Sequence, residues 1–109
     1  MVKTTIIKDS SSGYRGFRFI GHAGYDEYGK DIVCAAASVL AQNTVNSIET
    51  FTEDKFRCQV DEKKGMLTFR FTGSVSEESK LLMDSMVLGL TSIEETYGSQ
   101  YIKILFEEV

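Results

Sequence analysis

Hydrophobic and polar residues alternate along five short stretches of the chain, and this pattern predicts β-strands. The predicted strands cover residues 1–8, 14–20, 56–60, 66–71 and 101–106. In the first stretch the alternation is weak, but β-branched residues, which favour strands, dominate it. Polar stretches that carry a glycine, at residues 9–13 and 61–65, separate neighbouring strands, so we expect two β-hairpins.

A helical pattern follows the first hairpin. From residue 32 to residue 41, nine of ten residues are apolar, and only Ser38 is polar. A helix that is apolar all round is buried all round, so we expect one side of it to lie on the sheet and the other to be covered as well. Asp31 fits the N-cap position before it, and residues 49–55 form its end and a loop.

The second predicted helix runs from Ser74 to about Tyr97. Ser74 and Glu77 have the spacing of a capping box, and Gly98 suits the position just after a helix. Its apolar stripe comprises Leu82, Met86, Gly89, Ile93 and Tyr97, widened by Met83 and Leu90, with Leu81 and Leu88 off it. The width of the stripe, and a glycine within it, predict packing on both the sheet and the other helix.

The predicted elements follow the order ββαββαβ. Strand and helix stretches are mixed, so we expect an α+β fold with a mixed or antiparallel sheet and two helices packed on one face. A chain of 109 residues predicts one domain, residues 1–109. Its apolar surface exceeds what a small domain buries, which predicts a homodimer.

Composition and charge exclude several classes of protein. Hydrophobic residues make up 42% of the chain and charged residues 26%, as in ordinary soluble proteins. No cluster of Lys and Arg accompanies the net charge of −4, so direct binding to nucleic acid is not supported. The absence of a membrane-length apolar stretch and of a signal peptide, together with two cysteines, predicts a cytoplasmic protein. One histidine and two cysteines without ligand spacing predict no metal site, and we expect no cofactor.

The candidate chemistry lies in His22, the only histidine, and Cys34, one of two cysteines. A thiol becomes a strong nucleophile as a thiolate, and a nearby imidazole or a helix N-terminus lowers its pKa. If Asp31 caps the helix, Cys34 lies in the first turn, where the helix dipole favours negative charge. The Asp31 carboxylate itself opposes a thiolate, and its alternative role is to orient the imidazole.

The segment between this histidine and this cysteine has two interpretations. Glycine-framed residues 24–29 form either a lid that closes over a substrate or a plain surface loop. Tyr25 and Tyr28 would contact an extended peptide if the segment is a lid. Ser38 has two interpretations as well, because its hydroxyl can bond near the thiol or the substrate, or back to the carbonyl of Cys34. On the predicted helix, one common face carries Cys34, Ser38, Ala41 and Val45.

Each cysteine also has a purely structural interpretation. Free cysteine is among the most buried residue types, so Cys34 in an alanine-rich helix can be a packing residue. The glycine-flanked histidine in the same stretch favours a functional role instead, so both interpretations of Cys34 stay open. Phe56, Cys58 and Val60 lie on one side of a predicted strand, which predicts Cys58 to be an inert core residue.

The run Gly21-His22-Ala23, followed by Gly29-x-Asp31-Ile32-Val33-Cys34-Ala35-Ala36-x-Ser38, resembles the signature of the ribosomal-processing cysteine proteases, the Prp family. The resemblance covers nearly the whole chain. It implies that His22 is the base and Cys34 the nucleophile, and that Gly21, Asp31 and Ser38 are further motif positions. It also implies a homodimer whose substrate is the N-terminal extension of large ribosomal subunit protein twenty-seven, cut after a pair of aromatic residues.

Three functions therefore stand as hypotheses. The first is a cysteine endopeptidase with a basic ribosomal protein as substrate, in which backbone N–H groups near the helix start would hold the oxyanion. The second is a dimeric cytoplasmic module that binds a basic ribosomal partner without chemistry. The third is a thiol redox enzyme, which is the weakest because no second cysteine lies near Cys34 in the sequence.

Overall fold

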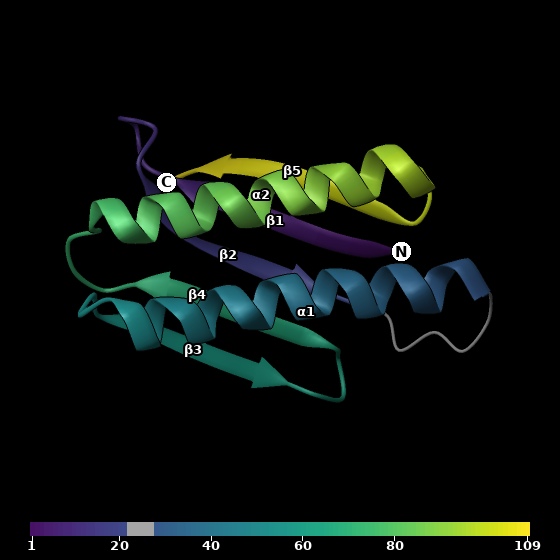
Figure 1. Cartoon of the computed structure of the whole chain (residues 1–109), viewed down its shortest axis with the longest axis horizontal. Helices are drawn as coiled ribbons and strands as arrows, with labels where there is room; N and C mark the ends of the chain where they lie inside the picture. Colours follow the sequence, from purple (N-terminus) through teal and green to yellow (C-terminus); the bar gives the residue numbers. More distant parts are fainter. Residues whose placement is uncertain (22–27) are drawn as a thin grey trace.

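The computed structural model of the protein describes residues 1–21 and 28–109, with residues 28–31 described by their backbone alone. Within these residues the order is ββαββαβ, as predicted (Figure 1). The elements are β1 (Val2–Lys8), β2 (Tyr14–Ile20), α1 (Tyr28–Phe51), β3 (Phe56–Asp61), β4 (Met66–Phe71), α2 (Glu77–Tyr97) and β5 (Ile102–Glu108).

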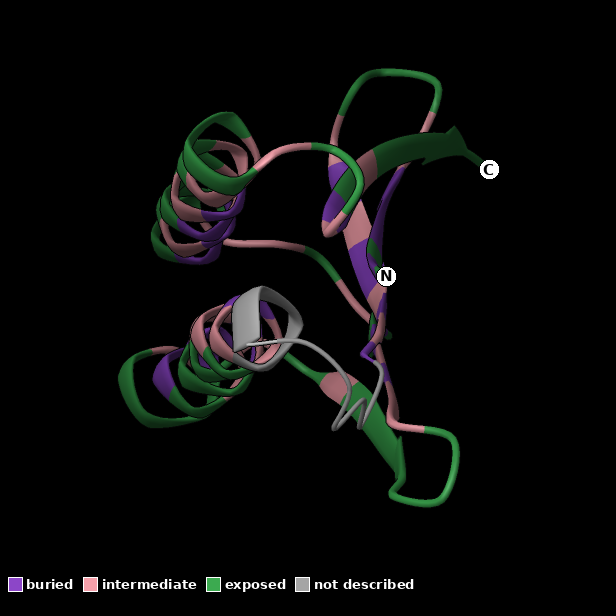
Figure 2. Ribbon diagram, turned by 90° about the vertical axis from the view of Figure 1, so that its right-hand side faces the viewer, coloured by how far each residue is buried: buried purple, intermediate pink, exposed green. Residues whose placement is uncertain are grey.

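The strands form one mixed sheet in the order β3-β4-β2-β1-β5. Neighbouring strands are antiparallel except β1 and β5, which are parallel. α1 therefore joins the parallel strands β2 and β3, and α2 joins the parallel strands β4 and β5. The two connections start from β2 and β4, which are antiparallel, and they cross the sheet in opposite directions. If both have the usual right-handed sense, both helices lie on the same face of the sheet. Figure 2 shows them side by side on that face, which confirms the predicted α+β fold.

The core lies between this face and the helices. In the middle of the sheet Phe17 stacks on Phe69, with ring centroids 5.4 Å apart, and both side chains are fully buried. The buried apolar residues of the helices are Val33, Ala37, Ala41 and Ile48 of α1 and Met83, Met86 and Leu90 of α2. Small residues thus seat α1 on the sheet, while long flexible ones fill the space beneath α2.

The expectation that the first helix is buried all round is wrong. Ala35 is exposed, and Val39 keeps 65% of its surface accessible. The reason is geometric: the sheet lies beneath α1 and α2 lies beside it, but no other described element covers its outer side (Figure 2).

The two helices touch closely where α2 carries Gly89. A Cβ added at this glycine would lie 2.8 Å from Cδ1 of Leu40 on α1, so a larger residue would displace the Leu40 side chain. This confirms the predicted contact of α2 with both the sheet and the other helix. Tyr97, which was placed on the predicted stripe, is exposed. Leu81 and Leu88, which were placed off it, are exposed as well.

The bounds of α1 differ from the prediction at both ends. The helix begins at Tyr28, so Asp31 lies inside it rather than at its N-cap, and it continues to Phe51. Gly29 suggests a loop in the sequence, but one glycine costs a helix only about 1 kcal/mol, which a long helix can absorb. Across the described residues, neither helix is long and apolar enough to span a membrane.

The start of α2 is fixed by a contact that local sequence does not reveal. Its N-cap is Ser76, not Ser74, and the Ser76 hydroxyl accepts the N–H of Ser79. Asp54, in the connection between α1 and β3, accepts hydrogen bonds from the Ser76 N–H at 2.9 Å, the Ser76 hydroxyl at 2.7 Å and the Ser79 hydroxyl at 2.5 Å. A distant carboxylate therefore selects between two possible caps. The end of α2 is as predicted, because the Gly98 N–H donates to the Glu94 carbonyl.

Asp54→Ala should lower the free energy of unfolding by about 2 kcal/mol, because it removes the acceptor of three hydrogen bonds at a helix start. Partial burial would raise the pKa of Asp54, but the hydrogen bonds from Ser79 and Ser76 outweigh it and leave the pKa lowered. The stabilisation from Asp54 is thus present above the ordinary carboxyl pKa and is lost as pH falls through the lowered one. Urea unfolding of Asp54→Ala at acidic and neutral pH measures this stabilisation, with Glu53→Gln as the control. Equal stability of the two variants at neutral pH would contradict the role of Asp54.

Candidate functional site

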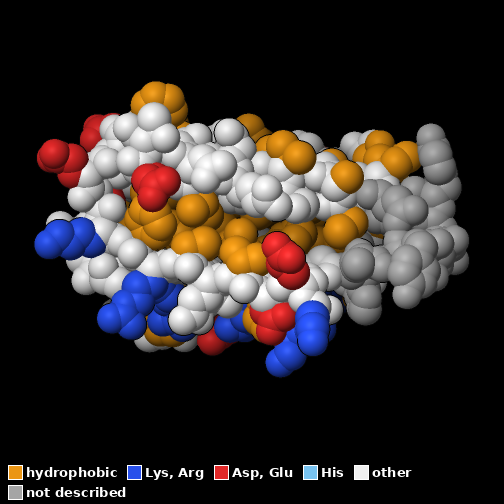
Figure 3. Space-filling model, turned by 90° about the horizontal axis from the view of Figure 1, so that it is seen from below, with side chains coloured by type: hydrophobic (Ala, Val, Ile, Leu, Met, Phe, Trp, Pro, Cys, Tyr) orange, Lys and Arg blue, Asp and Glu red, His pale blue; other side chains and the backbone are white. Residues whose placement is uncertain are grey.

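A groove of about 520 Å³ runs between α1 and the hairpin of β3 and β4. Figure 3 shows hydrophobic side chains gathered along the middle of this face of the molecule, with acidic side chains beside them. The lining residues come from the end of β2 (Phe19, Gly21), from α1 (Cys34, Ser38, Ala41, Gln42, Val45, Asn46) and from the hairpin (Cys58, Val60, Asp61, Glu62, Gly65, Met66, Leu67). The helix face predicted from the sequence, which carries Cys34, Ser38, Ala41 and Val45, is therefore the helical wall of the groove.

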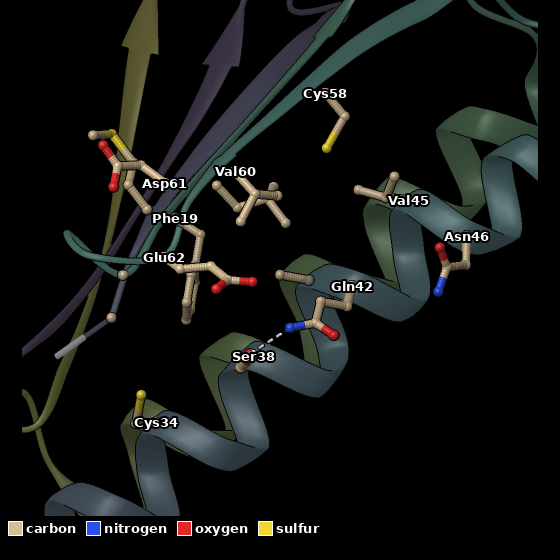
Figure 4. Close-up of a pocket in the computed structure, with 15 residues that line it drawn as sticks. Phe19, Cys34, Ser38, Gln42, Val45, Asn46, Cys58, Val60, Asp61 and Glu62 are labelled. Carbon is tan, nitrogen blue, oxygen red and sulfur yellow. Dashed lines mark hydrogen bonds between the residues drawn. The ribbon is translucent and has the colours of Figure 1, made fainter. Parts of the chain in front are cut away.

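Cys34 stands at one end of this groove, on α1 (Figure 4). The residue is partly buried and packs against the hydrophobic core, while its thiol lines the groove. It is the seventh residue of α1, so it lies beyond the first turn, contrary to the prediction. Its backbone N–H belongs to the regular ladder of the helix, and the helix dipole acts most strongly one turn earlier. The dipole therefore favours a thiolate less than the sequence suggested.

Gly21 lies directly against this thiol. The residue is buried at the end of β2, and a Cβ added to it would lie 3.1 Å from the Cys34 Sγ and 2.9 Å from Cε1 of Phe19. Its N–H donates to the carbonyl of Gly65 in the β3–β4 turn at 2.8 Å. The structure thus brings together two of the predicted site residues, Gly21 and Cys34, although they belong to different elements.

The other predicted site residues are placed only in part. Ser38 lies one turn after Cys34, and its hydroxyl oxygen accepts a hydrogen bond from Nε2 of Gln42 at 3.0 Å (Figure 4). Its predicted bonds to substrate or to the Cys34 carbonyl stay predictions. Tyr28 and Asp31 belong to α1, which shortens the predicted loop at residues 24–29, and their side chains are outside the described structure. His22 and Tyr25 lie outside the described residues.

Cys58 is not the core residue predicted from the sequence. It is exposed on β3, and Val60 keeps 63% of its surface accessible. β3 is an edge strand, and α1 leaves the groove in front of it instead of packing on it. Desolvation of the Cys58 thiol against the groove wall raises its pKa, and the Glu49 carboxylate raises it further. The second thiol is therefore a weak nucleophile at neutral pH.

Sequence reasoning missed several lining residues. Gln42 and Asn46 continue the Cys34 face at helical spacing, so the period of the helix could have revealed them. Glu62 and Met66 lie some thirty residues away in a hairpin, and nothing local in the sequence directs them toward Cys34. Among the residues that the structure describes, no group of three or more His, Cys, Asp and Glu side chains is arranged to hold a metal ion.

A thiol at the end of an open groove that can admit an extended chain fits the class of thiol-dependent hydrolases. The family model described as cysteine protease Prp matches residues 1–103. The chain belongs to this family.

Individual relatives agree with this assignment. The chain is 36% identical over 78 residues to the ribosomal processing cysteine protease Prp of Staphylococcus aureus, covering 72% of this chain and 74% of that protein. A crystal structure of the essential ribosomal processing protease Prp from S. aureus with a substrate peptide superposes with a TM-score of 0.90 at 28% identity, covering 98% of this chain and all of that one. A second, with a covalently linked product peptide, gives a TM-score of 0.86 at 29% identity, covering 98% and 100% of the two chains.

These similarities confirm the resemblance inferred from the sequence, the fold and the enzyme class, a cysteine peptidase.

Alkylation separates the two thiols of the groove. At neutral pH iodoacetamide should label Cys34 before Cys58, because the raised pKa leaves little Cys58 thiolate. Labelling of Cys58 should accelerate as the pH rises through its raised pKa. Peptide mapping by mass spectrometry measures both rates, with Cys58→Ala as the single-site control. Equal rates at neutral pH would contradict the difference.

Proposed function

We propose that the protein is a cysteine endopeptidase that removes the N-terminal extension of large ribosomal subunit protein twenty-seven, with Cys34 as nucleophile and His22 as base. The observation that carries the proposal is the position of the Cys34 thiol, at one end of a groove that is open to solvent and large enough for several peptide residues (Figure 4). The S. aureus relative is known in complex with a substrate peptide and, in a second structure, with a covalently linked product peptide. A covalent link to the peptide is what catalysis by a nucleophilic residue produces.

The proposed reaction has two halves. The imidazole of His22 takes the proton of the Cys34 thiol, and the thiolate attacks the scissile carbonyl carbon. The carbon–nitrogen bond then breaks, the imidazolium gives its proton to the leaving amine, and the acyl group remains on sulfur as a thioester. Water, deprotonated by the same imidazole, hydrolyses the thioester to a carboxylic acid and restores the thiol.

The sequence adjacency of Gly21 and His22 supports this pairing. Gly21 lies against the Cys34 sulfur, and His22 is the next residue in the chain. In the chain, the proposed base therefore directly follows the residue that touches the thiol.

The lining of the groove suits the proposed substrate. Val45, Val60 and Leu67 offer an apolar wall for the aromatic side chains expected before the cleaved bond. Glu62 lines the same groove, and Figure 4 shows its carboxylate turned toward α1. This carboxylate and the net charge of −4 favour a basic peptide. The homodimer expected from the family stays a prediction, for which exposed Leu81 and Leu88 offer an apolar face.

Cys34→Ala should abolish cleavage of a peptide that spans the ribosomal extension, because it removes the sulfur that is proposed to accept the acyl group. Cys58→Ala, which removes the other thiol, should still cleave after the aromatic pair. Mass spectrometry of the products measures both variants beside the wild type. Cleavage by Cys34→Ala would refute the proposed nucleophile, and no cleavage by the wild type would favour a non-enzymatic binding module.

Glu62→Gln should raise KM for a peptide with lysines beside the cleaved bond about two- to fivefold, the effect of losing one solvent-exposed ion pair. The difference from the wild type should shrink as salt screens the interaction. The matched control is Glu95→Gln, which removes an equal charge from an exposed position of α2 outside the groove lining. If both variants change KM equally, overall charge and not Glu62 is responsible.

A further inference from the structure

We propose that Gly65, in the turn between β3 and β4, is a positioning residue for the thiol chemistry: it holds Gly21 in place against the sulfur of Cys34. The catalytic part of this inference rests on the proposed function. Gly65 lies far from His22 and Cys34 in the sequence. Gly65 has no chemical group of its own, so it acts only through Gly21.

The two glycines are in direct backbone contact. The Gly21 N–H donates to the Gly65 carbonyl at 2.8 Å. A Cβ added to Gly65 would lie 2.2 Å from the carbonyl oxygen of Gly21 and 3.2 Å from its carbonyl carbon. Both polar ends of Gly21 therefore lie against one residue of the turn, and no side chain fits between them.

The other side of Gly21 faces the site. A Cβ there would meet the Cys34 Sγ at 3.1 Å and the Phe19 ring at 2.9 Å. Gly21 is thus packed between the turn and the thiol, without free space on either side. Any displacement of the turn toward Gly21 must move Gly21, the sulfur, or the chain that continues to His22.

Sheet register and turn geometry fix Gly65 at this place. Met66 pairs with Ile20 of β2 and with Asp61 of β3, so the residues just beyond these pairs, Gly65 and Gly21, meet. Gly65 has φ +62°, a left-handed conformation that glycine adopts without strain. Its N–H donates to the Glu62 carbonyl at 3.2 Å, which closes the turn.

Gly65→Ala should lower kcat/KM about 10- to 100-fold, mainly through kcat, because a displacement on the order of 1 Å at the reacting groups has this effect. It should also change the dependence of the Cys34 alkylation rate on pH. If Gly65 only stabilised the fold, this dependence would stay unchanged. Asn accepts positive φ more readily than Ala, so Gly65→Asn adds the Cβ with less backbone strain and serves if Gly65→Ala does not fold.

Two controls separate positioning from stability. Gly98→Ala introduces a Cβ at another positive φ, +108°, at the end of α2, and Gly73→Ala introduces one into open space. Gly98→Ala should lower the melting temperature and leave the Cys34 alkylation profile unchanged, and Gly73→Ala should change neither.

The proposal is overturned if Gly65→Ala or Gly65→Asn keeps the wild-type kcat and alkylation profile, or if Gly98→Ala changes that profile equally. A wild type that cleaves no peptide would refute the proposed function separately. The alkylation profiles would then still decide whether Gly65 positions the surroundings of Cys34.

Discussion

The packing of α1 on the sheet through small side chains is the constraint on which the rest of the site depends. Val33, Ala37 and Ala41 are fully buried in the core, which lies between the helices and the sheet (Figure 2). The adjacent face of the same helix, with Cys34 and Ser38, then lies opposite the edge strand β3 without filling the space before it. A helix seated on larger residues would lie farther from the sheet and would widen the groove.

The connectivity of the sheet completes the site around this helix. β2 leads toward α1, so its end brings Gly21 to the beginning of the groove that α1 lines. The hairpin of β3 and β4 forms the opposite wall, and its turn reaches Gly21 through Gly65. Three segments that are separate in the sequence therefore meet at one sulfur atom. The glycines at this junction allow the contact because they carry no side chain.

Regular elements and the motif could be predicted from the sequence, but tertiary choices could not. Alternation placed β2 and β4 with the observed bounds, and helical spacing found the face of Cys34. The prediction of Ser74 as a cap was wrong because Asp54, a residue of another segment, selects Ser76. The prediction of a buried Cys58 was wrong because alternation identifies the inward face of a strand, not whether anything covers it. The sequence placed Glu62 and Gly65 in a hairpin turn, but only the pairing of β4 with β2 brings that turn to the site.

The central claim is that Cys34 forms the covalent bond to the substrate, and trapping that bond tests it most directly. The wild-type protein would be mixed with the peptide that spans the ribosomal extension, quenched in acid within the first turnover, digested and mapped by mass spectrometry. We predict a thioester between the N-terminal product and Cys34, and none on Cys58. An acyl group on Cys58, or consumption of the peptide with no acyl group on either cysteine, would contradict the account.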